Sequence, residues 1–192
     1  MKPNVFVLFG SPRHNGYTAC MLKYFFSCWD EIDAVVFDAY KENIKPCIHC
    51  GYCKKVRGCI YNDFIPVEKG LNNADVLIIA SPVYELSFPS PLKAVFDRTQ
   101  QYFEAKFSLG IQMPIQKHKA ALLFASYGST DSSGVEIMQK QLALAFRVMN
   151  AELLHTVVSA NTDNERDFDK NLIYSELDKA SQKLKQFLYA LP

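Results

Sequence analysis

Four cysteines lie close together in the stretch "CIHCGYCKKVRGC". Their spacing is C-x2-C-x2-C-x5-C, a pattern that chance placement rarely produces, and it comprises Cys47, Cys50, Cys53 and Cys59. Three closely spaced thiolates can hold three corners of a cubane iron–sulfur cluster, and a fourth thiolate slightly further along the chain can hold the last corner. The spacing therefore predicts a [4Fe–4S] cluster bound by this loop.

Three other interpretations of the same cysteines remain open. Four thiolates can bind tetrahedral zinc, although structural zinc sites usually pair two C-x2-C units across a wider gap. A C-x2-C unit can also form a redox-active disulfide, and the loop can be a reduced remnant without any cofactor. The remaining cysteines, Cys20 and Cys28, lie in a helix-like stretch and are predicted to be plain core thiols.

The stretch "FGSPRHNGYT", residues 9–18, combines residue types that suit the binding of a phosphate. Gly10 and Gly16 permit a tight turn and a close approach to a ligand. Ser11 and Thr18 supply hydroxyl groups, Arg13 supplies positive charge, and a following helix would present free N–H groups to an anion. The sequence predicts a phosphate cradle here, the alternative being a capped turn with no ligand.

Two further turns contain residues that suit a flat ring system. "SPVYELSFPSP", residues 81–91, contains Pro82, Val83 and Tyr84 after an apolar run, and "SYGSTDSSG", residues 126–134, is rich in small residues. Peptide groups there would meet the polar edge of a ring while apolar atoms cover its face. We expect these turns, including Tyr127 and Gly128 in the second, to form further sides of the same pocket.

Alternating short apolar runs and helix-like stretches must position these turns. Five continuous apolar runs are typical of buried parallel strands, and five amphipathic stretches between and after them are typical of helices. The last stretch has a predicted apolar face formed by Phe168, Leu172, Ile173, Leu177, Leu184 and Phe187. The predicted strands are 4–10, 34–40, 75–84, 119–128 and 152–160, and the predicted helices are 18–29, 64–74, 90–105, 132–150 and 164–191.

This alternation predicts a doubly wound α/β fold. Five parallel strands with right-handed crossovers suit the flavodoxin-like order 2-1-3-4-5, with helices on both faces and one switch point at which ligands bind. With no repeat, low-complexity tract or linker in the sequence, we expect one domain over residues 1–192. The cysteine-rich segment 44–63 is an insertion in that domain.

Composition limits the classes of partner. The chain has 192 residues and a formal net charge of +1, so no global basic field attracts nucleic acid or a membrane surface. No apolar stretch approaches the roughly 20 residues of a membrane span, and the first apolar run is too short for a signal peptide. We therefore expect a cytoplasmic protein, in a compartment where thiols remain reduced.

Taken together, "GSPRHNGYT", "SPVYELSFPSPLKAVFDR" and the cysteine loop resemble the NADPH-dependent FMN reductase and iron–sulfur flavoprotein family. The resemblance implies FMN as a cofactor, with its phosphate at Ser11, Arg13, Tyr17 and Thr18. It also implies contacts between the isoalloxazine and Pro82, Val83, Tyr84 and Glu85. Assemblies in this family are commonly dimers or tetramers, so the resemblance implies a homodimer or homotetramer.

The sequence and the resemblance lead to an expected function. We expect an NAD(P)H-dependent, FMN-containing oxidoreductase that passes electrons, from reduced nicotinamide or through the cluster, to a small acceptor such as a quinone, flavin, azo compound or oxygen. The alternative is an electron carrier or redox-sensing flavoprotein with no substrate turnover of its own. A third interpretation is a flavin-free binding protein with a metal–thiolate loop.

Overall fold

A computed structural model describes residues 2–164 and 169–190 of the chain. Five strands form one sheet in the order β2-β1-β3-β4-β5, and every neighbouring pair is parallel. The predicted flavodoxin-like order is therefore confirmed. The strands are β1 (Asn4–Phe9), β2 (Asp33–Asp38), β3 (Val76–Pro82), β4 (Lys119–Ser126) and β5 (Ala151–Ser159).

Seven α-helices and two short 3₁₀ helices connect and cover the strands in the described ranges. The α-helices are α1 (Tyr17–Ser27), α2 (Ala39–Glu42), α3 (Ile65–Asn73), α4 (Ser90–Arg98), α5 (Gln100–Phe107), α6 (Ser133–Met149) and α7 (Lys170–Ala190). The 3₁₀ helices, η1 (Tyr52–Lys54) and η2 (Asn62–Phe64), lie in and at the end of the cysteine-rich segment.

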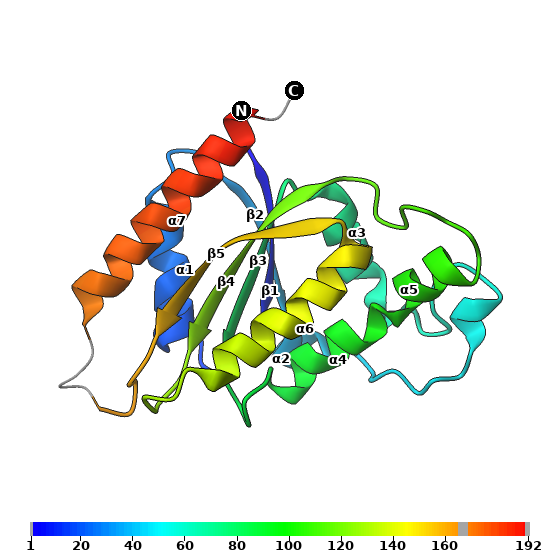
Figure 1. Ribbon diagram of the computed structural model, residues 1–192, viewed down its shortest axis with the longest axis horizontal. Helices are drawn as coiled ribbons and strands as arrows, with labels where there is room; N and C mark the ends of the chain where they lie inside the picture. Colours follow the sequence, from blue (N-terminus) through cyan, green and yellow to red (C-terminus); the bar gives the residue numbers. More distant parts are fainter. Residues whose placement is uncertain (1, 165–168, 191–192) are drawn as a thin grey trace.

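The helices form a layer on each face of the sheet (Figure 1). Side chains of β1 alternate between the two layers, as the pleat of a strand requires. Val5, Val7 and Phe9 pack with residues of α1 and α7, whereas Phe6 and Leu8 pack with residues of α3, α4 and α6. Because β1, β3 and β4 are covered on both faces, their sequences are continuously apolar.

Some helical details differ from the sequence-based expectation. The stretch 90–105, expected as one helix, is two, because α4 ends at Arg98 and α5 begins at Gln100. Leu172 is 60% exposed and lies off the packed face of α7, which contains Ile173, Leu177 and Leu184. Cys20 is exposed rather than in the core, because α1 buries the face that carries Met21, Leu22 and Phe25. Phe168 lies outside the described residues.

The cysteine-rich segment projects beyond the sheet beside α5 (Figure 1). Its two ends are fixed in the core, since Ile44 and Phe64 both belong to the buried cluster on the α3, α4 and α6 face. The chain between these two residues carries all four closely spaced cysteines. In the described part of the protein, none of the helices is long and apolar enough to span a membrane.

Candidate functional site

A cavity of about 280 Å³ lies at the carboxyl ends of the strands, where doubly wound folds bind ligands. Its walls come from the loops after β1, β3, β4 and β5. Every residue that the sequence and the resemblance nominated for cofactor binding lines this cavity, with the exception of Glu85. These lining residues are Ser11, Arg13, Gly16, Tyr17, Thr18, Pro82, Val83, Tyr84, Tyr127 and Gly128.

Hydrogen bonds hold the loop between β1 and α1 in shape. The hydroxyl of Ser11 accepts a bond from the backbone N–H of Arg13 (3.2 Å), and the buried hydroxyls of Thr18 and Ser126 lie 2.8 Å apart. The N-cap of α1, Gly16, has no side chain that could cap the helix, and helix N-termini are common binding places for anions.

Gly10 serves close packing rather than an unusual backbone conformation. Its φ is not in the left-handed region, but an added Cβ would collide with the side chain of Leu92 on α4. A second close approach occurs at Gly128, where an added Cβ would collide with the carboxylate of Asp163. These two glycines bring α4 and the loop after β5 close to the cavity.

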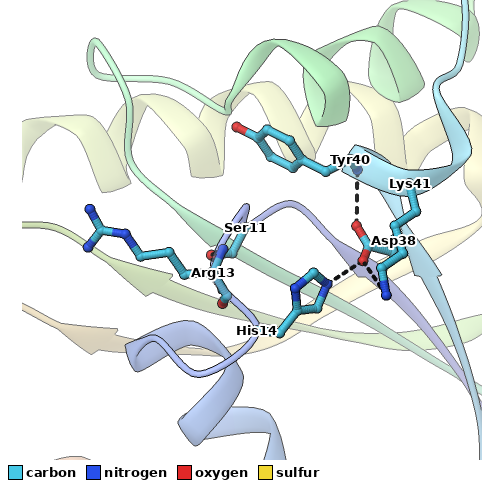
Figure 2. Close-up of polar contacts among 6 residues, drawn as sticks. All are labelled: Ser11, Arg13, His14, Asp38, Tyr40 and Lys41. Atoms are coloured by element: carbon cyan, nitrogen blue, oxygen red, sulfur yellow. Dashed lines mark hydrogen bonds and ion pairs between the residues drawn. The ribbon is translucent and has the colours of Figure 1, made fainter.

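His14 links the first loop to the neighbouring strand (Figure 2). Its Nε2 lies 2.6 Å from Oδ2 of Asp38, at the end of β2, and Oδ1 of Asp38 accepts the backbone N–H of Tyr40 at 3.0 Å. The imidazole is about half exposed, at 53%, and it also holds this carboxylate. Figure 2 shows the side chain of Arg13 extending away from the pair.

The turn after β3 has an unusual backbone. Tyr84 and Ser87 exchange two backbone hydrogen bonds, both of 2.9 Å, around Glu85 and Leu86. Both central residues have positive φ, 47° and 59°, a conformation that normally favours glycine or asparagine. Such strain, of order 1–3 kcal/mol per residue, is found where the surroundings fix a functional loop. Glu85 sits in this turn and not in the cavity wall.

Three more residues line the cavity: Ser126, which begins the predicted turn 126–134, and Thr162 and Asp163, which the sequence reasoning missed. Ser126 is the last residue of β4, so it directly precedes the predicted turn residue Tyr127. Thr162 and Asp163 lie in the loop after β5, whose carboxyl end reaches the same edge of the sheet. Extending the argument about strand ends to the fifth strand would have identified both.

A second, smaller cavity of about 30 Å³ lies between the cysteine-rich segment and helices α4 and α5, and Cys47, Cys50, Cys53 and Cys59 all line it. All six cysteines of the chain are free thiols. Burial raises the pKa of Cys53, and the neighbouring Glu104, Cys47 and Cys59 raise it further. Four thiols around one space match the ligand set of a [4Fe–4S] cluster. Over residues 2–164 and 169–190, no three His, Cys, Asp or Glu side chains are arranged to hold a single metal ion.

A buried ion pair fastens the cysteine-rich segment to α4. Arg98, only 2% exposed, lies 2.9 Å through Nη2 from Oδ1 of Asp63, and Oδ2 of Asp63 accepts the backbone N–H of Lys45 at 2.9 Å. Burial acts to raise the pKa of Asp63, but the Lys45 amide and the Arg98 guanidinium together hold that pKa below its ordinary value of 3.8. The carboxylate therefore stabilises the segment in its ionised form.

Comparison with protein families identifies one that covers most of the chain. A family model described as NADPH-dependent FMN reductase matches residues 3–165. Among curated proteins, an iron–sulfur flavoprotein of Methanocaldococcus jannaschii is 39% identical over 98 residues, which are 49% of this chain and 49% of that protein. Another iron–sulfur flavoprotein, from Archaeoglobus fulgidus, is 29% identical over 115 residues, which are 59% of this chain and 55% of that protein. The chain thus spans about half the length of the curated relatives that it matches.

Solved structures share the fold over nearly the whole chain. An NAD(P)H:quinone oxidoreductase from Methanothermobacter marburgensis superposes with a TM-score of 0.76 at 18% identity, covering 96% of this chain and 97% of that one. An FMN-dependent NADH-azoreductase from Bacillus anthracis, in complex with FMN, superposes with a TM-score of 0.64 at 13% identity. This superposition covers 94% of this chain and 99% of that one. At these identities the likeness establishes the fold alone.

The Asp63 contacts predict a pH-dependent loss of stability in Asp63→Asn. At pH 7 we expect the free energy of unfolding to fall by about 1.5–3 kcal/mol, because a charge-assisted bond is lost and Arg98 stays buried without its anion. The pKa of Asp63 is lower in the folded protein than in the unfolded chain, where it is 3.8. The extra free energy of unfolding of the wild type is therefore complete above pH 3.8, and it disappears as the pH falls through the folded-state pKa. Urea unfolding across this pH range measures the difference in free energy of unfolding between wild type and Asp63→Asn.

Asp97→Asn is the matched control. Asp97 pairs with Lys93 at 2.5 Å, but both side chains are well exposed. Exposed ion pairs contribute about 0.2–1 kcal/mol to stability, so the free energy of unfolding of this variant should remain close to that of wild type at every pH. Equal losses in the two variants, or a loss in Asp63→Asn that persists at low pH, would contradict the role given to Asp63.

Proposed function

Since the chain belongs to the NADPH-dependent FMN reductase family, we propose that it is an FMN-containing oxidoreductase that uses NAD(P)H and reduces a small acceptor. When bound, FMN accepts a hydride from reduced nicotinamide and passes electrons to an acceptor such as a quinone, flavin, azo compound or oxygen. The observation that carries the proposal is the cavity at the strand ends, which unites the residues of three separately nominated turns. The chain's own residues bind and orient the cofactor there.

The phosphate of FMN would bind to the loop between β1 and α1. Arg13 lines the cavity and supplies the positive charge, and no ion pair of its guanidinium occurs within the described ranges. The uncapped first turn of α1 adds N–H donors, and Ser11, Tyr17 and Thr18 line the same wall. Helix N-termini and arginine together form a common binding arrangement for phosphate.

The ring system of FMN would rest between the turns after β3 and β4. Pro82, Val83 and Tyr84 line one wall, and Tyr127 and Gly128 line the other. The backbone N–H of Val83 donates to Ser126 at 2.8 Å, so the two turns are fixed to each other. The strained turn at Glu85 and Leu86 holds Tyr84, which is 44% exposed, at the mouth of the cavity, where a nicotinamide or acceptor would approach.

We assign the cysteine-rich segment to a [4Fe–4S] cluster, bound by Cys47, Cys50, Cys53 and Cys59. When bound, such a cluster exchanges single electrons, whereas a flavin also handles electron pairs. The chain's contribution is to bring four free thiols to one cavity beside α5. The two cavities share no lining residue, so each can be altered without disturbing the walls of the other.

A homodimer or homotetramer is the proposed assembly. Large apolar side chains are exposed on the cysteine-rich segment, on α5 and on the loop that follows, and surfaces of this kind mark association sites. They are Ile48, Val56, Ile60, Phe103, Phe107 and Met113. In a self-associating protein these residues would lose contact with water.

Phe107→Glu should weaken this assembly, because it places a charge in the proposed interface. Sedimentation velocity should show the wild type as a dimer or larger species and the variant shifted toward monomer. Leu144→Glu, at an equally exposed position on α6, is the control and should sediment as wild type does. A monomeric wild type, or equal effects of the two variants, would refute the proposed interface.

Arg13→Gln should reduce the affinity for FMN by about 10- to 100-fold, the equivalent of one charge-assisted hydrogen bond. Quenching of flavin fluorescence on titration measures the dissociation constant. Riboflavin lacks the phosphate, so its affinity should be the same in variant and wild type.

Lys23→Gln, which removes one positive charge from an exposed position of α1, is the control and should leave both affinities unchanged. Equal weakening of FMN and riboflavin in Arg13→Gln would place the phosphate elsewhere.

The cofactor content of anaerobically purified protein tests the proposed function as a whole. We expect bound FMN that bleaches on addition of NADPH or NADH, and about four iron atoms per chain, the number in one cubane cluster. Cys47→Ser should lose the iron but keep the FMN and its bleaching, because Cys47 does not line the flavin cavity. Iron analysis and the flavin absorption bands are the measurements.

Cys20→Ser, at an exposed cysteine outside the cysteine-rich segment, is the matched control and should retain both cofactors. Protein that holds FMN but bleaches only with dithionite or a reduced ferredoxin would instead be an electron carrier. Protein that takes up no FMN would overturn the proposal.

A further inference from the structure

One arginine closes both ends of the cysteine-rich segment. Nη1 of Arg98 donates to the backbone carbonyl of Lys45 at 2.8 Å, and Nη2 donates to that of Tyr61 at 3.2 Å and pairs with Asp63. Lys45 stands two residues before the first of the four clustered cysteines, and Tyr61 stands two residues after the last. The side chain thus lies at the neck of the loop and determines how far apart its ends are.

The same side chain has an unused donor. Within the described residues, Nε of Arg98 is buried and has no hydrogen-bond partner. A buried donor left unpaired is destabilising, so native proteins rarely retain one. Arg98 lines the cavity that the four cysteines surround. Its guanidinium carbon lies 5.3 Å from the ring centroids of both Tyr61 and Phe64, which limits its movement.

An opposite charge lines the same cavity. Glu104, on α5, is only 6% exposed, and Gln100 donates to its Oε1 at 3.0 Å. A hydrogen bond from the hydroxyl of Ser108, on the same carboxylate, lowers the pKa of Glu104. The cysteine cavity is therefore flanked by one buried cation and one buried anion.

We propose that Arg98 is a positioning residue for the cysteine-bound cluster, holding the loop closed and directing a buried N–H and a positive charge toward the cluster's sulfur atoms. This inference rests on the proposed cluster. Hydrogen bonds to sulfur and net charge both set the reduction potential of such clusters. Positive charge stabilises the form that has gained an electron, so Arg98 raises the potential and Glu104 lowers it.

Potentiometric titration of the whole protein, followed by the electron paramagnetic resonance of the reduced cluster, tests this assignment. Arg98→Met should lower the midpoint potential by the equivalent of about a tenfold change in the reduction equilibrium, about 59 mV for one electron. Glu104→Gln should raise the potential. Arg98→Lys keeps the charge but loses the planar fork of donors, so its potential should lie between those of wild type and Arg98→Met.

The FMN potential is the internal control and should not move, because neither residue lines the flavin cavity. Arg98→Met that carries full iron at the wild-type potential, or shifts of equal sign in Arg98→Met and Glu104→Gln, would overturn the proposal. Loss of iron from Arg98→Met, with iron retained in Arg98→Lys, supports the role of Arg98 in holding the loop closed. In that case the expected rise of the cluster's midpoint potential in Glu104→Gln tests the effect of charge on the potential. Wild-type protein that binds FMN but no iron would refute the cluster itself, and this inference with it.

Discussion

Burial of both faces of a parallel sheet is the constraint on which this structure depends. The central strands β1, β3 and β4 are covered by helices on each side, so nearly all of their side chains pack against these helices, and those that line the cavity lie at the carboxyl ends of the strands. Functional groups must therefore come from the loops at the strand ends. The crossovers place the loops after β1, β3, β4 and β5 around one cavity, and close packing at Gly10 and Gly128 draws its walls together.

The cysteine-rich segment obeys a different constraint. It lies beyond the sheet, without a hydrophobic layer of its own, and polar contacts compensate for that lack. Arg98 holds two backbone carbonyls and one carboxylate at its neck, and Nη2 of Arg57 donates to the carbonyl of Pro114 at 3.3 Å. Since these contacts come from α4, from the segment itself and from the loop after α5, the geometry around the four thiols is supported independently of the cavity at the strand ends.

The local pattern of apolar and turn-forming residues was sufficient to predict most of the fold. Continuous apolar runs identified the five strands, although the edge strand β2 is exposed over residues 33–36 and the edge strand β5 is mostly half-buried. Glycine, hydroxyl and proline residues at the strand ends identified three walls of the cavity. Contacts between distant segments were beyond such reasoning. The pairs His14–Asp38 and His155–Glu176 join residues far apart in sequence, and neither histidine showed a partner in its own stretch. Arg98 follows an apolar stripe beside Asp97, which indicated a local salt bridge or an interface contact; its partner is instead the distant Asp63, and nothing near Arg98 in the sequence indicated that a loop would fold over it.

The meeting of the two ends of the cysteine-rich segment has a consequence for how such proteins diverge. The backbone N–H of Lys45 donates to the side-chain carboxylate of Asp63 at 2.9 Å, so the two ends of the segment lie beside each other where they leave the core. No residue of the segment lines the cavity at the strand ends, so a change in the length of the segment need not move the walls of that cavity. The fold therefore leaves the segment free to vary in length and composition while the cavity keeps its shape.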